Sequence, residues 1–132
     1  GGGIGFTMIK LLKKSPRKRM PFDDIYANYI NKYGIIDAEI LDSIQKSRRK
    51  EFARWLSDRL TRENKVDLAV DVLERAGLHE EAASMAISQA IHYRGIDEVE
   101  RAKFYYRKAA ELLRKAGKAT EAEEIEEFIQ RL

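Results

Sequence analysis

The chain has 132 residues, of which 44% are hydrophobic and 36% charged, a balance that is typical of one globular domain and excludes a disordered chain. It contains no cysteine, which excludes disulfides, thiolate nucleophiles, iron–sulfur clusters and cysteine zinc sites together, and fits a reducing compartment. No apolar run reaches the ~20 residues that a membrane-spanning helix needs, so we expect a cytoplasmic protein without integral membrane association.

Charge is unevenly distributed along the sequence. Residues 1–20 hold six of the 25 basic side chains and no acidic one, which leaves 19 basic and 22 acidic side chains in 21–132. We interpret 1–20 as a flexible basic arm, and 1–7 as a cloning remnant ahead of Met8. The arm residues that we regard as candidate phosphate contacts are Lys13, Lys14, Arg17, Lys18 and Arg19.

Residues 21–132 are predicted to form a single all-α domain of about six antiparallel helices. A first helix is expected at 22–33, because its apolar residues recur at spacings of three and four and Gly34 follows them. A second segment runs from 38 to about 60, with Asp37 as its N-cap. The basic run 46–50 interrupts its apolar stripe, and either breaks the helix or lies on a solvated face.

Four further helices are predicted at 65–76, 79–93, 98–116 and 119–131. Gly77, Gly95 and Gly117 separate these segments, and no alternating strand pattern appears between them. Helices joined by loops this short pack as antiparallel neighbours.

Two windows of the sequence repeat with an offset of 33 residues. Small residues recur with small ones and large residues with large ones, which favours close packing of paired helices. The matched pairs are Ser57 with Ala90, Leu60 with Tyr93, Ala69 with Ala102, Leu73 with Tyr106, and Ala76 with Ala109.

These pairs and the segment AKFYYRKAAEL resemble the tetratricopeptide repeat over about residues 50–116. The resemblance implies a right-handed superhelix of α-hairpins, with residues 119–132 as the capping helix that such arrays need. A plain helical bundle is the alternative.

The resemblance also implies a peptide-binding groove lined by the first helix of each unit. Its candidate residues here are Arg54, Asp58, Ile87, Ile91 and Arg94. Repeats that bind the terminal carboxylate of a peptide carry polar residues at these positions. Because Ile87 and Ile91 stand there in this chain, we expect an apolar groove. A partner protein, or the chain's own 22–49 segment, would fill it.

Phe104 is a second candidate contact. The buried stripe of its helix runs through Ala102, Tyr106 and Ala109, so Phe104 points almost opposite, among charged residues. Tyr105 is expected at the edge of the stripe. An exposed phenylalanine on a charged face is suited to contact a partner or a second copy, or is covered by the last helix or the arm.

Basic residues form the third candidate site. Arg48, Arg49 and Lys50, with Arg54 and the arm, could bind the phosphate backbone of DNA or RNA.

The two histidines, His79 and His92, show no metal-ligand spacing, and no catalytic set stands out. We therefore expect no cofactor and no enzymatic activity, and predict a scaffold that binds another protein or itself. A small nucleic-acid-associated protein is the alternative.

Overall fold

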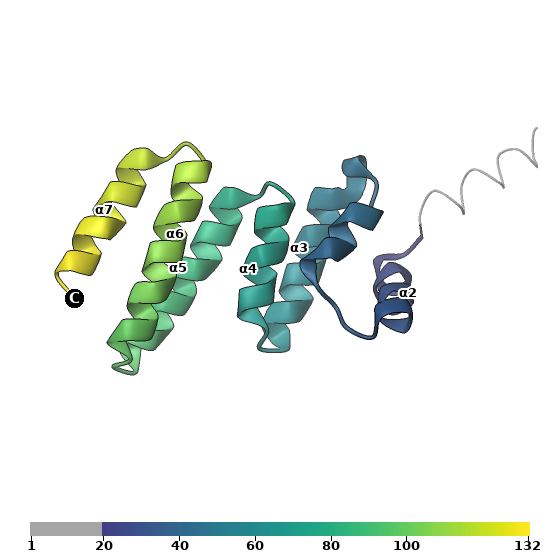
Figure 1. Cartoon of the computed structure of the whole chain (residues 1–132), viewed down its shortest axis with the longest axis horizontal. Helices are drawn as coiled ribbons and strands as arrows, with labels where there is room; N and C mark the ends of the chain where they lie inside the picture. Colours follow the sequence, from purple (N-terminus) through teal and green to yellow (C-terminus); the bar gives the residue numbers. More distant parts are fainter. Residues whose placement is uncertain (1–19) are drawn as a thin grey trace, which may run out of the picture. The chain divides into compact units, whose positions relative to one another are not determined.

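A computed structural model describes residues 20–132, and these residues are helical, with no strand among them (Figure 1). The all-α prediction is confirmed. The chain divides into two compact units, one that ends at Ile36 and one that runs from Asp37 to Leu132. No helix in 20–132 has the length and apolar character to cross a membrane. Residues 1–19 of the predicted arm, including Lys13, Lys14, Arg17, Lys18 and Arg19, lie outside the described residues.

The first unit contains helix α2, Phe22–Tyr33, with the bounds that the sequence predicts. Pro21 precedes it, and its fixed φ of −58° suits the entry to a helix. Asp23 and Asp24 in the first turn interact favourably with the helix dipole. Gly34, at φ +78°, ends the helix in the left-handed conformation.

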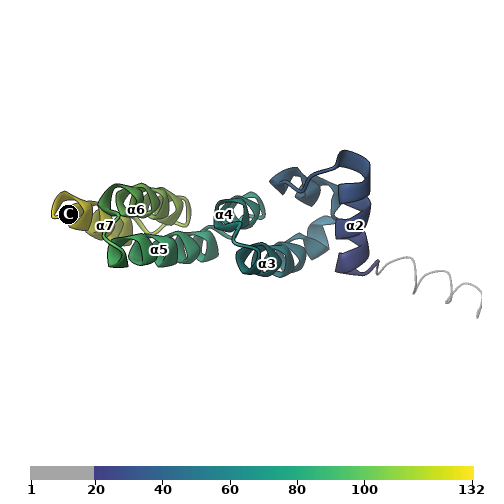
Figure 2. The same ribbon diagram turned by 90° about the horizontal axis from the view of Figure 1, so that it is seen from below.

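The second unit consists of one short 3-10 helix and five α-helices. They are η1 (Ala38–Ser43), α3 (Lys46–Arg62), α4 (Val66–Arg75), α5 (His79–Gly95), α6 (Val99–Lys115) and α7 (Ala119–Gln130). Each of these helices contacts the next one along the chain, so α3–α4 and α5–α6 form antiparallel hairpins and α7 packs on α6. Seen from below, α3 and α5 lie in one layer and α4 and α6 in the other (Figure 2).

The predicted 38–60 segment is broken into two elements. Asp37 caps η1, since its side chain accepts a hydrogen bond from the Glu39 amide at 3.0 Å. Ile44 and Gln45 then adopt extended backbone conformations, and α3 begins at Lys46. Of the two alternatives left open by the sequence, the break is therefore correct, and it lies just before the basic run.

Element η1 covers one end of the first hairpin. Its Ile40 and Leu41, with Ile44 after it, are buried, and it contacts both α3 and α4. The Asp42 carboxylate forms an ion pair with Arg75 of α4 at 2.7 Å. Residues 38–43 of the 22–49 segment thus pack against α3 and α4. That this segment fills the predicted groove stays a prediction.

The helix starts of the second unit keep the 33-residue offset of the sequence. Helix α3 begins at Lys46 and α5 at His79, and both have 17 residues. Helix α4 begins at Val66 and α6 at Val99. Helix α6 is seven residues, or about two turns, longer than α4, so the two hairpins differ at their ends. The tetratricopeptide-like superhelix itself stays a prediction.

Small residues line the buried sides of α5 and α6, which pack against each other. On α5 they are Ala82, Ala83, Ala86 and Ala90, and on α6 they are Ala102, Ala109 and Ala110, all buried. Alanine has no side-chain atom beyond Cβ, and side chains this short let the two helix backbones approach closely.

An ion-pair cluster links the second helices of the two hairpins. The Glu74 carboxylate of α4 accepts hydrogen bonds from Lys108 at 3.0 Å and Lys115 at 2.5 Å, both on α6. Burial raises the pKa of Glu74, but the hydrogen bonds and charges of the two lysines outweigh it and hold the pKa below its usual range.

Two glycines of the second unit provide a matched test of its turns. Gly77 follows α4 at φ +81°, where an alanine Cβ is disfavoured, whereas Gly95 ends α5 without a positive φ. No atom lies within 4 Å of a Cβ built at either position. We expect Gly77→Ala to lower the free energy of unfolding by about 1–2 kcal/mol. Gly95→Ala should leave it unchanged or raise it by about 0.5 kcal/mol. Urea denaturation measures both, and equal effects would contradict this account of the turn.

Candidate interaction surfaces

Aromatic side chains gather near the loop end of the α5–α6 hairpin, and we call Tyr93, Phe104 and Tyr105 the aromatic surface. The rings of Tyr93 and Tyr105 stack with centroids 5.6 Å apart and an angle of 9° between their planes. The Phe104 ring lies edge-on to Tyr105 at 5.1 Å. The three side chains therefore form one continuous array from two helices.

A hydrogen bond from α6 to α4 fixes the array. The Tyr105 hydroxyl donates to the Asp67 carboxylate at 2.5 Å. Burial and this carboxylate raise the pKa of Tyr105 to about 12, so the phenol remains a donor at neutral pH. Three helices of the second unit thus hold Tyr105 in place.

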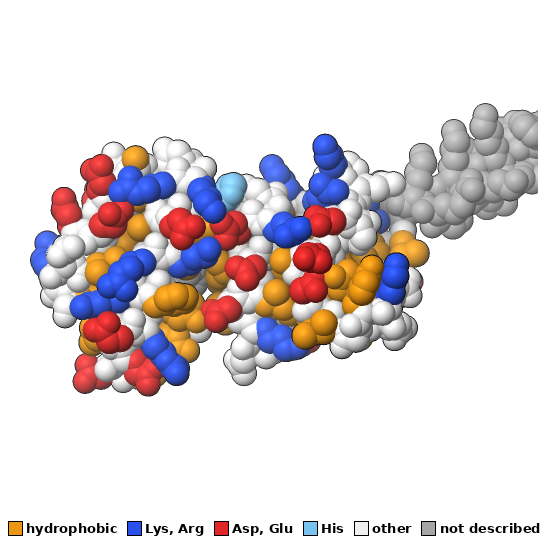
Figure 3. Space-filling model, in the orientation of Figure 1, with side chains coloured by type: hydrophobic (Ala, Val, Ile, Leu, Met, Phe, Trp, Pro, Cys, Tyr) orange, Lys and Arg blue, Asp and Glu red, His pale blue; other side chains and the backbone are white. Residues whose placement is uncertain are grey.

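Phe104 is the exposed member of the array. Its side chain is 59% exposed, in agreement with its predicted outward direction. It borders a shallow depression of about 510 Å³ whose other lining residues are Asp67, Tyr93, Glu100, Arg101 and Tyr105. On the face drawn in Figure 3, apolar side chains lie beside acidic and basic ones over α4 and α6.

The sequence places Tyr105 at the edge of the buried stripe and Phe104 on the outer face, and the half-buried Tyr105 and exposed Phe104 agree with this. The contacts that join Tyr105 to Phe104 and Tyr93 were not predicted. In the structure Tyr106 is buried against Phe128 of α7, while Tyr105 bridges Phe104 to Tyr93. The sequence does contain a signal for these contacts. Tyr93 and Tyr105 lie 33 residues after Leu60 and Val72, which are aliphatic and fully buried.

The hydroxyl of Tyr105 gives a direct test of this site. We expect it to titrate at about 12, and Asp67→Asn to lower that pKa towards 10. Because the folded pKa lies above the unfolded one, the associated stability is fully present below about pH 10 and is lost as the pH rises towards 12. NMR of ring-labelled tyrosine measures the pKa, with Tyr105→Phe to assign the signal. A Tyr105 signal that titrates near 10 in the wild-type protein would contradict the hydrogen bond.

The residues of the predicted groove divide into paired charges and apolar side chains. Arg54 of α3 binds the Glu81 carboxylate of α5 at 2.8 Å, which ties the two first helices together. Asp58 pairs with Arg62 one turn away on its own helix. Both charges are therefore engaged within the chain.

The α5 part of that predicted groove is more apolar. Ile91 is 57% exposed and Ile87 is half-buried. The Arg94 guanidinium lies over the Phe128 ring of α7, 4.8 Å from its centroid. This contact places Arg94 beside α7, whereas Ile91 of α5 remains exposed.

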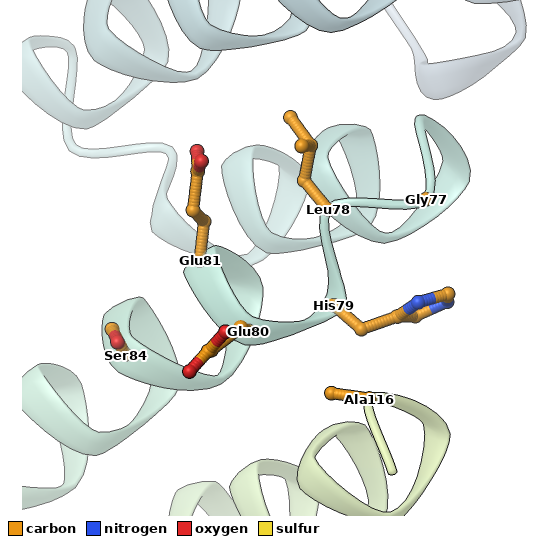
Figure 4. Close-up of a pocket in the computed structure, with 7 residues that line it drawn as sticks. All are labelled: Gly77, Leu78, His79, Glu80, Glu81, Ser84 and Ala116. Carbon is orange, nitrogen blue, oxygen red and sulfur yellow. The ribbon is translucent and has the colours of Figure 1, made fainter.

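A second depression, of about 480 Å³, lies where the α4–α5 and α6–α7 connections come together (Figure 4). Glu81 points to the side of Leu78, whereas His79 and Glu80 point to the side of Ala116. Glu80 forms an ion pair with Lys118 at 3.1 Å. These charges link neighbouring turns, and no group of three metal-ligating side chains occurs among residues 20–132.

The basic patch occupies the first turns of α3. Its Lys46 and Lys50 are exposed, and Arg48 and Arg49 are half-buried. Arg49 donates a hydrogen bond to the Ile44 carbonyl at 2.8 Å, so it helps to hold the bend that precedes α3. Arg54 is likewise engaged, by Glu81, so several side chains of the predicted patch are bound within the chain.

Comparisons with protein-family models, with curated proteins and with solved structures found no match to this chain. The geometry of these surfaces is therefore the basis for proposing a function.

Proposed function

We propose that this protein is a non-catalytic helical scaffold that binds another protein, or a second copy of itself, through the aromatic surface. The observation that supports the proposal is the exposed Phe104 ring beside a depression on the α5–α6 hairpin. Large aromatic side chains are enriched in protein–protein interfaces and supply much of their binding energy. Because ring contacts and the Asp67 hydrogen bond already order the site, little entropy is lost on binding.

A photo-cross-linking amino acid in place of Phe104 tests the proposal in the native cell, with Glu123 on α7 as the control position. Both side chains are exposed, but only Phe104 belongs to the aromatic surface. We expect a defined product from position 104 alone. The complex is then rebuilt from purified components, and Phe104→Ala should weaken it on the order of tenfold, whereas Glu123→Ala should not. Identical products from both positions, or no product together with a monomer in sedimentation experiments, would contradict the proposal.

Nucleic-acid binding is the second candidate, because Lys46 and Lys50 are exposed at the start of α3. Phosphate contacts of this kind give affinity that falls steeply with salt. Binding to duplex DNA and to RNA is measured at two salt concentrations, with and without residues 1–20. Absence of binding at low salt would exclude this candidate, and strong binding lost on truncation would displace the scaffold proposal.

A further inference from the structure

We propose that the aromatic surface recognises a basic peptide segment, with an arginine or lysine against the tyrosines and the acidic side chains, and an apolar residue against Phe104. This inference rests on the proposed function and names the chemistry of the partner.

The tyrosine rings are suited to bind a cation, because the Tyr93 ring already contacts the cationic side chain of Arg101. The Arg101 guanidinium lies over the Tyr93 ring, 5.4 Å from its centroid. The electron-rich face of an aromatic ring attracts guanidinium and ammonium groups within about 6 Å. The ion pair that Arg101 forms is weak, since its carboxylate partner, Glu98, is exposed and lies 3.4 Å away. A partner cation can therefore add to this array or replace Arg101.

Acidic side chains border the same depression from two helices. Asp67 comes from α4 and Glu100 from α6, against the single basic side chain of Arg101. Glu100 is 86% exposed, and its nearest cation, Lys103, is 3.9 Å away, so its charge remains available to a partner. The charge that faces the depression favours a cation and opposes a phosphate or an acidic peptide.

Other titratable groups lie on the helices that pack around the depression. On α4, Asp71 lies one turn beyond Asp67, and burial raises its pKa more than Lys108 lowers it. On α6, Lys108 is engaged by Glu74. On α5, His92 lies edge-on to Tyr93 at 5.3 Å. None of these groups adds an unpaired cation that would cancel the two carboxylates.

The test uses a labelled peptide with the sequence of residues 8–20, MIKLLKKSPRKRM, which combines apolar and basic side chains. A matched peptide carries glutamine in place of every lysine and arginine. The protein is the full chain, both native and with the arm neutralised by glutamine at all six basic positions, Lys10, Lys13, Lys14, Arg17, Lys18 and Arg19, so that its own arm cannot compete. Fluorescence anisotropy measures the Kd at low salt.

We expect the basic peptide to bind the arm-neutralised chain at least about fivefold more tightly than the glutamine peptide, since cation–π and ion-pair contacts together are worth about 1 kcal/mol. Phe104→Ala, and Asp67→Asn combined with Glu100→Gln, should each weaken binding about fivefold. The control, Glu123→Gln combined with Glu124→Gln on α7, removes the same charge elsewhere and should change the Kd less than about twofold.

Two results of the peptide experiment would overturn the inference. One is equal affinity for the two peptides, or no binding of either at millimolar concentration. The other is an equal effect of the site pair and the α7 pair, which would indicate attraction to overall charge. A cross-link from position 104 to a partner that lacks a basic segment would sustain the proposed function while excluding this chemistry.

Discussion

Replacing Phe52 by alanine is expected to lower the free energy of unfolding by about 3–5 kcal/mol. Phe52 is the largest of the fully buried side chains, with 0% of its surface exposed, and its ring lies 5.6 Å from that of Trp55. It belongs to α3, which packs on both α4 and η1. Its removal would leave a cavity where the first hairpin packs, and close packing does not allow neighbours to fill such a space without strain.

Urea denaturation followed by circular dichroism measures this loss, and Phe104→Ala is the matched control. The two substitutions delete the same atoms, one from the core and one from the exposed surface. The control should change the free energy of unfolding by about 0.5 kcal/mol or less. A comparable loss from both variants would show that Phe104 is covered, and would remove the basis of the proposed interaction surface as well.

The bounds of α4 to α7 could be predicted closely because local sequence determines where these helices begin and end. Gly77 and Gly117 take the left-handed backbone that ends α4 and α6, and the apolar spacing gives the other bounds of α4 to α7 within about two residues. Small residues at a 33-residue offset likewise indicated which positions are buried. Ser57, Ala90, Ala69 and Ala102 are all buried, as close hairpin packing requires.

The bend before α3 could not be placed because tertiary contacts determine it. The 38–60 sequence has no glycine or proline that would interrupt a helix. The chain turns at Ile44 and Gln45, where Ile44 is buried and Arg49 binds its carbonyl group. Intrinsic helix propensity takes no account of these contacts, and the burial of η1 against α3 and α4 overrides it.

The aromatic surface was incompletely predicted for a similar reason. A helical wheel gives the direction of Phe104, but it does not show that Tyr105 reaches Asp67, 38 residues earlier, or stacks on Tyr93 of another helix. Such contacts depend on how two helices are rotated against each other. The sign of them in the sequence is that Tyr93 and Tyr105 carry aromatic rings where Leu60 and Val72, 33 residues earlier, are aliphatic.

Replacing Ala86 by leucine is expected to lower the free energy of unfolding by about 1–3 kcal/mol. Ala86 is fully buried in α5, within the series of small residues that lets α6 approach. Three added carbon atoms would force the hairpin apart or its side chains out of their preferred rotamers. A plain amphipathic helix with a loosely packed core would accommodate leucine there and gain apolar burial, so the sign of the effect distinguishes close packing from a loose bundle.

Ser88→Leu, two residues further along the same helix, is the control for this substitution. Ser88 is exposed, and leucine has the better helix propensity, so the free energy of unfolding should stay constant or rise by a few tenths of a kcal/mol. Chemical denaturation of both variants gives the comparison. If Ala86→Leu stabilises the protein as Ser88→Leu does, the α5–α6 contact does not depend on small residues, and the physical reason for the 33-residue repeat is lost. If only Ala86→Leu destabilises, close approach of the two helices accounts for both the repeat and the rigid hairpin that presents Phe104.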